Sequence, residues 1–313
     1  MNPTTCPPFA SRLRAALLAS ACAAISASAA TPGTVPLRDL SWDHERAQEL
    51  SRVGQQVLEM EGIPWQHADS ERFIYHYVHR WMAERAAGEA ETFYAAVKRD
   101  LKAEEDRWEN KAHIFLFESG DAWRAFVEKF GVDRWSGGLC RDNEIFVCSP
   151  PKARPFTGIV LPHEIAHLAV HRFVRGRLPV WLGEGFAEQQ ARRHFTAYTR
   201  PKGYRFHFPP TVVEASAYLP LDELASAGSY PSDPAKVAAF YAEATRLVQM
   251  LMEDHPDADF LEFLQMMANG TKFETAVERV YGRHYRNLEA LEERFREVAI
   301  TKITAAGNAE GGR

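Results

Sequence analysis

One pentapeptide in the middle of the chain constrains its fold and chemistry more than any other segment. His163-Glu164-Ile165-Ala166-His167 has the pattern H-E-x-x-H and lies within the apolar run Gly158–Val170. Residues four apart lie on the same face of an α-helix, so a helix here aims the imidazoles of His163 and His167 at one point. Glu164 projects about 100° round the helix, beside that point. Burying these polar groups without partners would be costly, which favours a metal site.

A segment further along the chain contains a third candidate ligand. Glu184 lies seventeen residues after His167, in the sequence W-L-G-E-G-F-A-E that runs from Trp181 to Glu188. A catalytic zinc site has three protein ligands and keeps a fourth position open for water. If a second helix packs against the first, His163, His167 and Glu184 complete such a set and bind one Zn²⁺. The alternative is that the two histidines lie on a helix and bind nothing.

The two motifs together resemble those of the gluzincin zinc metallopeptidases, and within them those of the bacterial peptidase MA-like group. The resemblance extends over residues 71–299, although only the two motifs are specific. It implies an α+β, zincin-like fold, in which a small mixed β-sheet and an active-site helix precede a mainly helical C-terminal part. The metzincin pattern instead requires glycine and histidine where this chain has Val170 and Phe173, so it does not apply.

The resemblance also implies roles for single residues. Glu164 matches the general base of the family, and the two motif histidines with Glu184 match its zinc ligands. Glu188, four positions after Glu184, matches an acidic residue that orients a zinc histidine. Tyr241 lies where peptidase MA-like proteins carry a tyrosine at the start of a helix, which would stabilise the oxyanion. The alternative for Tyr241 is an ordinary amphipathic-helix residue whose hydroxyl is bonded locally.

This chemistry predicts a zinc-dependent peptidase that acts on a peptide or protein substrate. Zinc lowers the pKa of a bound water toward ~7 and polarises the scissile carbonyl. Glu164 takes the water proton as general base and passes it to the leaving amine. Two alternatives stay open. One is a zinc-binding scaffold or partner-binding protein with an inactive peptidase-like fold, and the other is a zinc amidase that acts on cell-wall material.

The first thirty residues predict export. Arg12 and Arg14 precede an apolar run from Ala15 to Ala27 that ends in small residues, a pattern typical of a cleavable signal peptide. The mature chain is therefore expected in the periplasm or outside the cell, with lipid anchoring at Cys22 as the alternative. No later segment predicts a membrane span. A net charge of −5 without a basic cluster predicts no nucleic-acid partner, and the oligomeric state is not predicted.

Two cysteines outside the leader lie close together in the sequence. Cys140 and Cys148 flank a segment that predicts a β-hairpin with its turn at Asp142-Asn143. In an oxidising compartment the two thiols are expected to form a disulfide, the alternative being two free cysteines whose side chains do not meet. The strand Glu144–Cys148 is the candidate edge strand for holding an extended substrate, the alternative being a purely structural hairpin.

Residues 31–303 are expected to form one catalytic domain, followed by a disordered tail at 304–313. Its expected parts are an N-terminal α/β part (31–155), the zinc-site helices (156–200) and a helical part (201–303). Hydrophobic periodicity predicts helices at 41–60, 81–102 and 121–130, strands at 72–78 and 112–118, and helices from 234 to 301.

Two local features leave alternatives open. Pro162 directly precedes the first motif histidine, and proline inside a helix removes a hydrogen bond. The zinc helix therefore either begins late, around Gly158, or bends at its entry. The connection from Tyr198 to Tyr230 is rich in proline, glycine and aromatic residues. It forms either one wall of a substrate cleft or an ordinary surface connection.

Overall fold

The computed structural model describes residues 35–104, 110–149, 158–200, 208, 213, 218–231 and 233–307, and it has an α+β architecture. The described residues form two compact units. The first contains the β-sheet and the helices up to α6 (Val160–Phe173), and the second contains the helices from α8 (Leu221–Ser226) onward. Helix α7 (Val180–Thr199) contributes residues to both units. The predicted leader and Cys22 lie outside the described residues.

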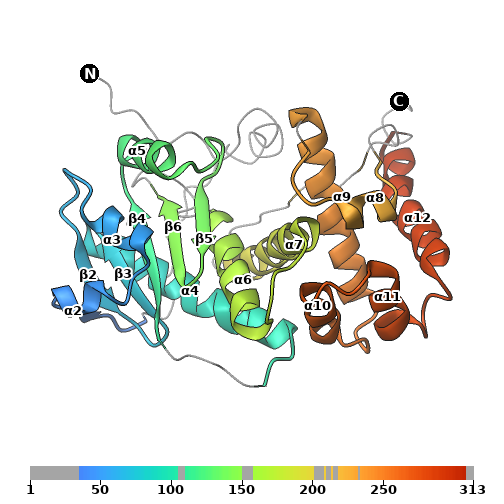
Figure 1. Cartoon of the computed structure of the whole chain (residues 1–313), viewed down its shortest axis with the longest axis horizontal. Helices are drawn as coiled ribbons and strands as arrows, with labels where there is room; N and C mark the ends of the chain where they lie inside the picture. The colour runs from blue at the N-terminus through green and yellow to red at the C-terminus, as the bar shows by residue number, and fades with distance from the viewer. Residues whose placement is uncertain are drawn as a thin grey trace. The chain divides into compact units, whose positions relative to one another are not determined.

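Six strands form one mixed sheet in the first unit (Figure 1). Strand β3 pairs in parallel with β4, and β4 with β6, whereas the other three pairs are antiparallel. The order across the sheet is β1 (Arg38–Asp39), β2 (Gln66–Asp69), β3 (Phe73–Tyr77), β4 (Ala112–Phe117), β6 (Glu144–Cys148) and β5 (Gly138–Arg141). The two strands predicted at 72–78 and 112–118 are confirmed as β3 and β4.

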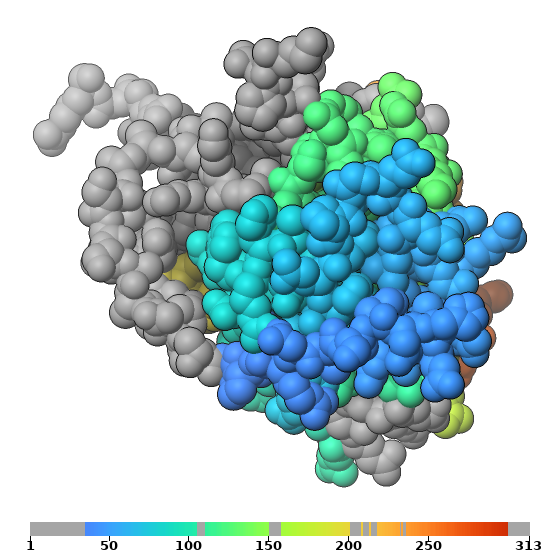
Figure 2. Space-filling view, turned by 90° about the vertical axis from the view of Figure 1, so that its left-hand side faces the viewer, coloured from blue at the N-terminus to red at the C-terminus, as the bar shows by residue number. Residues whose placement is uncertain are grey.

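Helices pack on the sheet through alternate residues of its strands. Phe115 of β4 and Phe146 of β6 lie in a core with Trp123 and Phe126 of α5 (Gly120–Phe130). Helix α5, predicted at 121–130, ends before Gly131, which adopts a left-handed φ of 67° as glycine commonly does at a helix C-terminus. The predicted helix at 81–102 is confirmed as α4 (Arg80–Asp100), which packs against β3. On the face shown in Figure 2, blue and cyan segments up to α4 lie beside the green segment around α5.

The predicted helix at 41–60 is wrong in its continuity. The structure has two shorter helices there, α2 (His44–Ala47) and α3 (Arg52–Leu58). Ser51 separates them because it is the N-cap of α3, with its hydroxyl accepting the Gly54 N–H at 3.2 Å. The Ser51 N–H and hydroxyl also donate to the carboxylate of Glu144, each at 2.6 Å. This non-local pairing breaks a periodicity that looks continuous in sequence.

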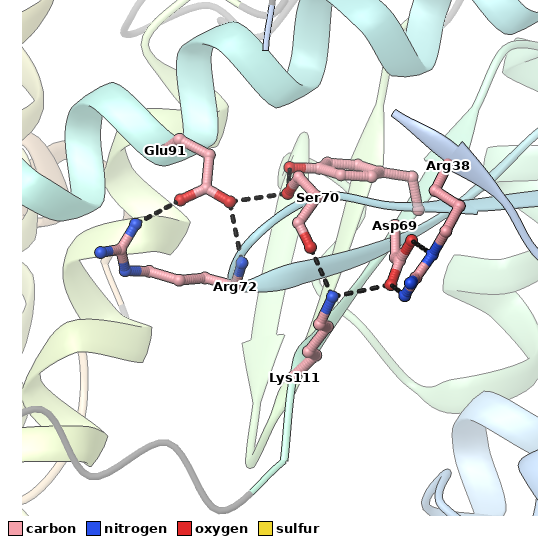
Figure 3. Close-up of polar contacts among 7 residues, drawn as sticks. Arg38, Asp69, Ser70, Arg72, Glu91 and Lys111 are labelled. Carbon is pink, nitrogen blue, oxygen red and sulfur yellow. Dashed lines mark hydrogen bonds and ion pairs between the residues drawn. The ribbon is translucent and has the colours of Figure 1, made fainter. Parts of the chain in front are cut away.

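Charged groups fix the turn between β2 and β3 (Figure 3). Asp69 is only 5% exposed and accepts from Arg38 at 2.6 Å and from Lys111 at 2.7 Å. Beside it, Ser70 donates to Glu91 of α4 at 2.6 Å. Burial alone would raise the pKa of Asp69, but the hydrogen bonds from Arg38 and Lys111 outweigh it and lower that pKa. Strand β2 was not predicted, since Gln-His-Ala-Asp has little strand propensity and is held by these partners.

The second unit is helical, as predicted for residues 234–301. Its longer helices are α9 (Pro234–Glu253), α10 (Phe260–Ala268), α11 (Phe273–Tyr281) and α12 (Leu288–Gly307). Helix α10 ends at Ala268, and Gly270 just after it adopts a left-handed φ of 79°. Helix α12 extends to Gly307, and the disordered tail predicted at 304–313 stays a prediction. Residues 308–313 lie outside the described part.

In the described part of the chain, no helix combines the length and apolar character needed to cross a membrane. The prediction of one catalytic domain over residues 31–303 stays a prediction beside the two compact units.

Candidate metal centre

Helix α6 carries the H-E-x-x-H motif, and its first turn explains how proline is tolerated. Gly158 adopts a left-handed φ of 58°, and the helix begins at Val160. Pro162 therefore lies in the first turn, where the missing N–H has no intrahelical acceptor in any case. His163 already donates its backbone N–H to Ile159 at 3.1 Å, which places the motif within regular helix. Of the two alternatives for Pro162, the structure therefore shows a helix that begins close to Gly158, with the proline in its first turn.

The two motif histidines face each other on α6. Their Nε2 atoms are 3.1 Å apart, and their ring centroids are 4.8 Å apart. Two nitrogens bound to one tetrahedral zinc at 2.0–2.1 Å lie about 3.3 Å from each other. His163 is 7% exposed and His167 is half-buried. The pair is therefore spaced as two ligands of one metal ion would be.

Glu184, on α7, joins this pair. One ligand atom from each of His163, His167 and Glu184 lies within 4.8 Å of the others. This is the one group of three or more histidine, cysteine, aspartate or glutamate side chains with that convergence in the described part of the chain. Two imidazole nitrogens and one carboxylate oxygen form a donor set that fits catalytic zinc. The structure thus brings together the three residues that the sequence singled out.

Tyr230 holds the carboxylate of Glu184. Its hydroxyl donates to Glu184 Oε1 at 2.8 Å. Its ring is parallel to that of Tyr241 within 15°, with centroids 6.0 Å apart. The structure thus places Tyr241, the predicted oxyanion donor, against Tyr230, and that catalytic role stays a prediction. Tyr230 was not predicted as a site residue, and the one sequence signal for it was the aromatic-rich connection that ends there.

A glycine explains the close packing of α7 on α9 beside Glu184. A Cβ added to Gly185 would lie 2.5 Å from the carbonyl oxygen of Ala244. The neighbouring atom is backbone, so it cannot move aside cheaply. Gly185 therefore lets α9, which carries Tyr241, approach α7 directly at the position after Glu184. The glycine in the motif W-L-G-E-G-F-A-E thus has a packing reason.

Glu188 lies one helical turn after Glu184 on α7 and is 4% exposed. Carboxylates are rarely buried unless they are paired or bonded. Its burial agrees with a role inside the protein rather than on a helix surface. The specific role of orienting a zinc histidine stays a prediction.

The edge strand beside the motif is β5, so the prediction that assigned the edge to Glu144–Cys148 is wrong. That strand is β6, which lies between β4 and β5. A Cβ added to Gly138 of β5 would lie 2.7 Å from Glu164 Oε1 and 2.7 Å from Val160 Cγ1. Figure 1 shows α6 running beside β5. The hairpin was predicted correctly, but the sequence did not show which of its strands would pair with β4.

The predicted disulfide between Cys140 and Cys148 does not form, because Cys140 is a free cysteine. The turn is at Asp142-Asn143 as predicted, with Asp142 at a φ of 53°. In this register Cys140 lies opposite Ile145, whereas the Cys148 N–H bonds to the carbonyl of Gly137. The two cysteines are therefore three positions out of register along the strands. Burial raises the pKa of the Cys140 thiol, and the nearby Glu164 carboxylate adds to this.

A second polar cluster, on the sheet, was not predicted. His67, His76 and His113 form a hydrogen-bonded chain, with N···N distances of 2.8 Å and 3.0 Å. Trp42 stacks on His67 at 4.8 Å, and Phe115 stacks on His76 at 4.2 Å. Burial lowers the pKa of His67 and of His113 to about 4, and that of His76 well below its ordinary value. Neutral imidazoles satisfy the chain, since each ring donates from one nitrogen and accepts at the other.

Comparisons with known proteins identify no relative of this chain by sequence. No model of a known protein family matches it, and no curated protein matches it. The two motifs and the geometry of the site are therefore the observations that bear on function.

Proposed function

We propose that the chain is a zinc-dependent peptidase with a gluzincin-like site in a zincin-like fold. His163, His167 and Glu184 hold one Zn²⁺, and the convergence of their ligand atoms within 4.8 Å is the observation that carries the proposal. Three protein ligands leave one coordination position for water, as catalytic sites do, whereas structural zinc sites are closed by four. This favours an enzyme over a zinc-binding scaffold.

Glu164 is the general base in this proposal. Zinc, when bound, lowers the pKa of a coordinated water and polarises the carbonyl of the substrate. The carboxylate of Glu164 accepts the proton of the attacking water and then delivers it to the leaving amine nitrogen. Glu164 is 7% exposed and lies against β5 at Gly138, so its carboxylate is confined to a narrow position. A confined carboxylate loses less conformational entropy when it adopts the geometry needed for proton transfer.

Strand β5 is the proposed docking edge for an extended substrate. Its Cys148–Gly137 hydrogen bond and its register show that the backbone groups of Gly138 and Cys140 point away from β6. The Ser136 hydroxyl already bonds to the N–H and carbonyl of Gly138. A peptide backbone can pair with Cys140 and replace the Ser136 hydroxyl at Gly138. The substrate would then lie antiparallel or parallel to β5, beside Glu164.

The substrate class and compartment belong to the same proposal. A peptide or protein in the periplasm or outside the cell is the expected substrate, because the first thirty residues predict export. A zinc amidase acting on cell-wall material would use the same ligands and base. Screening of peptide and cell-wall substrates separates the two.

Metal analysis combined with two variants tests the proposal. Purified protein is expected to contain about one zinc per chain, and His163→Ala is expected to lose most of it. Glu164→Gln is expected to retain zinc and lose hydrolysis by orders of magnitude, since glutamine keeps the shape of glutamate but cannot accept the proton. Stoichiometric zinc that survives substitution of both histidines would refute the ligand set. Unchanged turnover in Glu164→Gln would refute the role of the base.

A further inference from the structure

We propose that Tyr230 is a positioning residue of the metal centre, whose hydroxyl orients the carboxylate of Glu184 for metal binding. This inference rests on the proposed zinc site, and it adds a residue that neither motif contains. Tyr230 lies 46 positions after Glu184, in the connection before α9. Only the tertiary structure brings the Tyr230 hydroxyl to Glu184.

The hydrogen bond determines how the carboxylate is presented. Tyr230 Oη donates to Glu184 Oε1 at 2.8 Å, within the normal range for such a bond. A carboxylate has about four lone-pair sites on its two oxygens, so this bond restrains the orientation of the group and leaves sites for a metal ion. A glutamate side chain also loses rotamer freedom when it becomes a ligand. Tyr230 removes part of that loss before the metal arrives, which raises affinity.

The ring of Tyr230 is itself held by α9. It stacks on Tyr241 and meets the ring of Phe240 edge-on, with centroids 6.0 Å and 6.1 Å away. Phe240 is fully buried, so this aromatic support is anchored in the helical core. The same helix packs against α7 at Gly185, next to the glutamate. The hydroxyl is therefore positioned by the helix that packs directly on the one carrying Glu184.

Removal of the hydroxyl alone separates orientation from packing. Tyr230→Phe keeps the stacked ring and deletes only the donor to Glu184. Partners that orient metal ligands typically contribute roughly 10–100-fold to metal affinity or activity. We expect Tyr230→Phe to raise the zinc Kd by about that factor, measured by competition with a chromophoric chelator. The thermal stability of the metal-free protein is expected to change little.

Tyr218→Phe is the matched control. Tyr218 also donates to a glutamate in the same unit, Glu292 at 3.0 Å, but this contact involves none of the proposed ligands. The zinc Kd of the Tyr218→Phe variant is expected to equal that of the wild type. A zinc Kd for Tyr230→Phe within twofold of the wild type would overturn the inference, as would an equal loss in Tyr218→Phe.

A double-substitution cycle excludes an indirect effect. If Tyr230 acts through the carboxylate, Tyr230→Phe causes no further loss of zinc affinity in a Glu184→Ala background. Additive losses would overturn the inference. Its failure differs from failure of the proposed function: a wild type that binds no zinc, or binds it without His163, refutes the metal centre itself. Zinc bound through His163 together with an unaffected Tyr230→Phe refutes only the role of Tyr230.

Discussion

At the scale of single residues, Gly138 lets strand β5 lie close to Glu164, the proposed base, because glycine has no side chain. A methyl group on Gly138 would lie 2.7 Å from Glu164 Oε1, well inside van der Waals contact. The neighbouring atoms belong to side chains, so the structure can respond by moving Glu164 rather than by unfolding. The position of the carboxylate therefore depends on glycine at this point of β5.

Gly138→Ala is expected to lower kcat by about 10–100-fold, because displacement of a catalytic group by ~1 Å has effects of that size. The zinc content is expected to stay near that of the wild type, since Glu164 is not a ligand in the proposed site. Gly228→Ala serves as the control, because a Cβ there meets nothing within 4 Å. Steady-state kinetics with metal analysis checks this. Full activity in Gly138→Ala would contradict the prediction, since it would mean that the added methyl group does not displace the Glu164 carboxylate.

At the scale of elements, the histidine chain of β2, β3 and β4 makes the sheet sensitive to acid. Burial holds the pKa of His113 at about 4, below the ~6.5 of an exposed histidine. The unfolded chain therefore binds a proton that the folded chain excludes as the pH falls from 6.5 to 4. A lowered histidine pKa thus costs stability in that window and has no effect above it. For His113, at 1% exposed, the cost reaches roughly 3 kcal/mol near pH 4.

His113→Asn is expected to flatten the loss of stability between pH 6.5 and pH 4. The asparagine oxygen can still accept from His76, but it does not titrate. Chemical unfolding of the metal-free protein is the suitable measurement, since protonation of zinc ligands would otherwise add its own pH dependence. His44→Asn, at an exposed position on α2, is expected to keep the wild-type profile. If the free energy of unfolding falls equally with pH in His113→Asn and the wild type, the acid sensitivity does not come from His113.

At the scale of the whole molecule, the two compact units are expected to respond to pH in opposite directions. In the helical unit, Glu243 of α9 is fully buried and accepts the Leu219 N–H at 2.8 Å. Burial raises its pKa to about 8. The folded chain keeps this carboxyl protonated where the unfolded chain releases the proton, so stability is lost as pH rises from about 4.5 to 8.

Glu243→Gln is expected to raise the stability of the helical unit at pH 8–9 and to change it little at pH 5. Glutamine keeps an oxygen that accepts from Leu219 and carries no charge at any pH. The expected gain is on the order of 1 kcal/mol, or about 2–4 °C in Tm. Calorimetry at both pH values, with hydrogen exchange to assign the transition to α9, checks this. Equal stabilisation at pH 5 and pH 9 would point to packing instead of charge.

Local patterns in the sequence determined the parts that depend on near neighbours. The i, i+4 spacing of His163 and His167, the glycine stop after α5 and the two-residue hairpin turn all act within a few residues, so helix geometry and turn chemistry were sufficient. Glu184 was predicted from its resemblance to a known motif. Its approach to the histidines requires two helices to pack, which the sequence alone does not prove.

Only the tertiary structure decided which distant groups meet. Strand order placed β5 at the edge instead of Glu144–Cys148, and the hairpin register kept Cys140 away from Cys148. The contact of Ser51 with Glu144 divided a helix that looked continuous, and Tyr230 reached Glu184 from 46 residues away. Each outcome depends on which surfaces pair in the folded chain. A local sequence pattern does not predict which surfaces pair, because the free energy of pairing arises from groups far apart in the sequence.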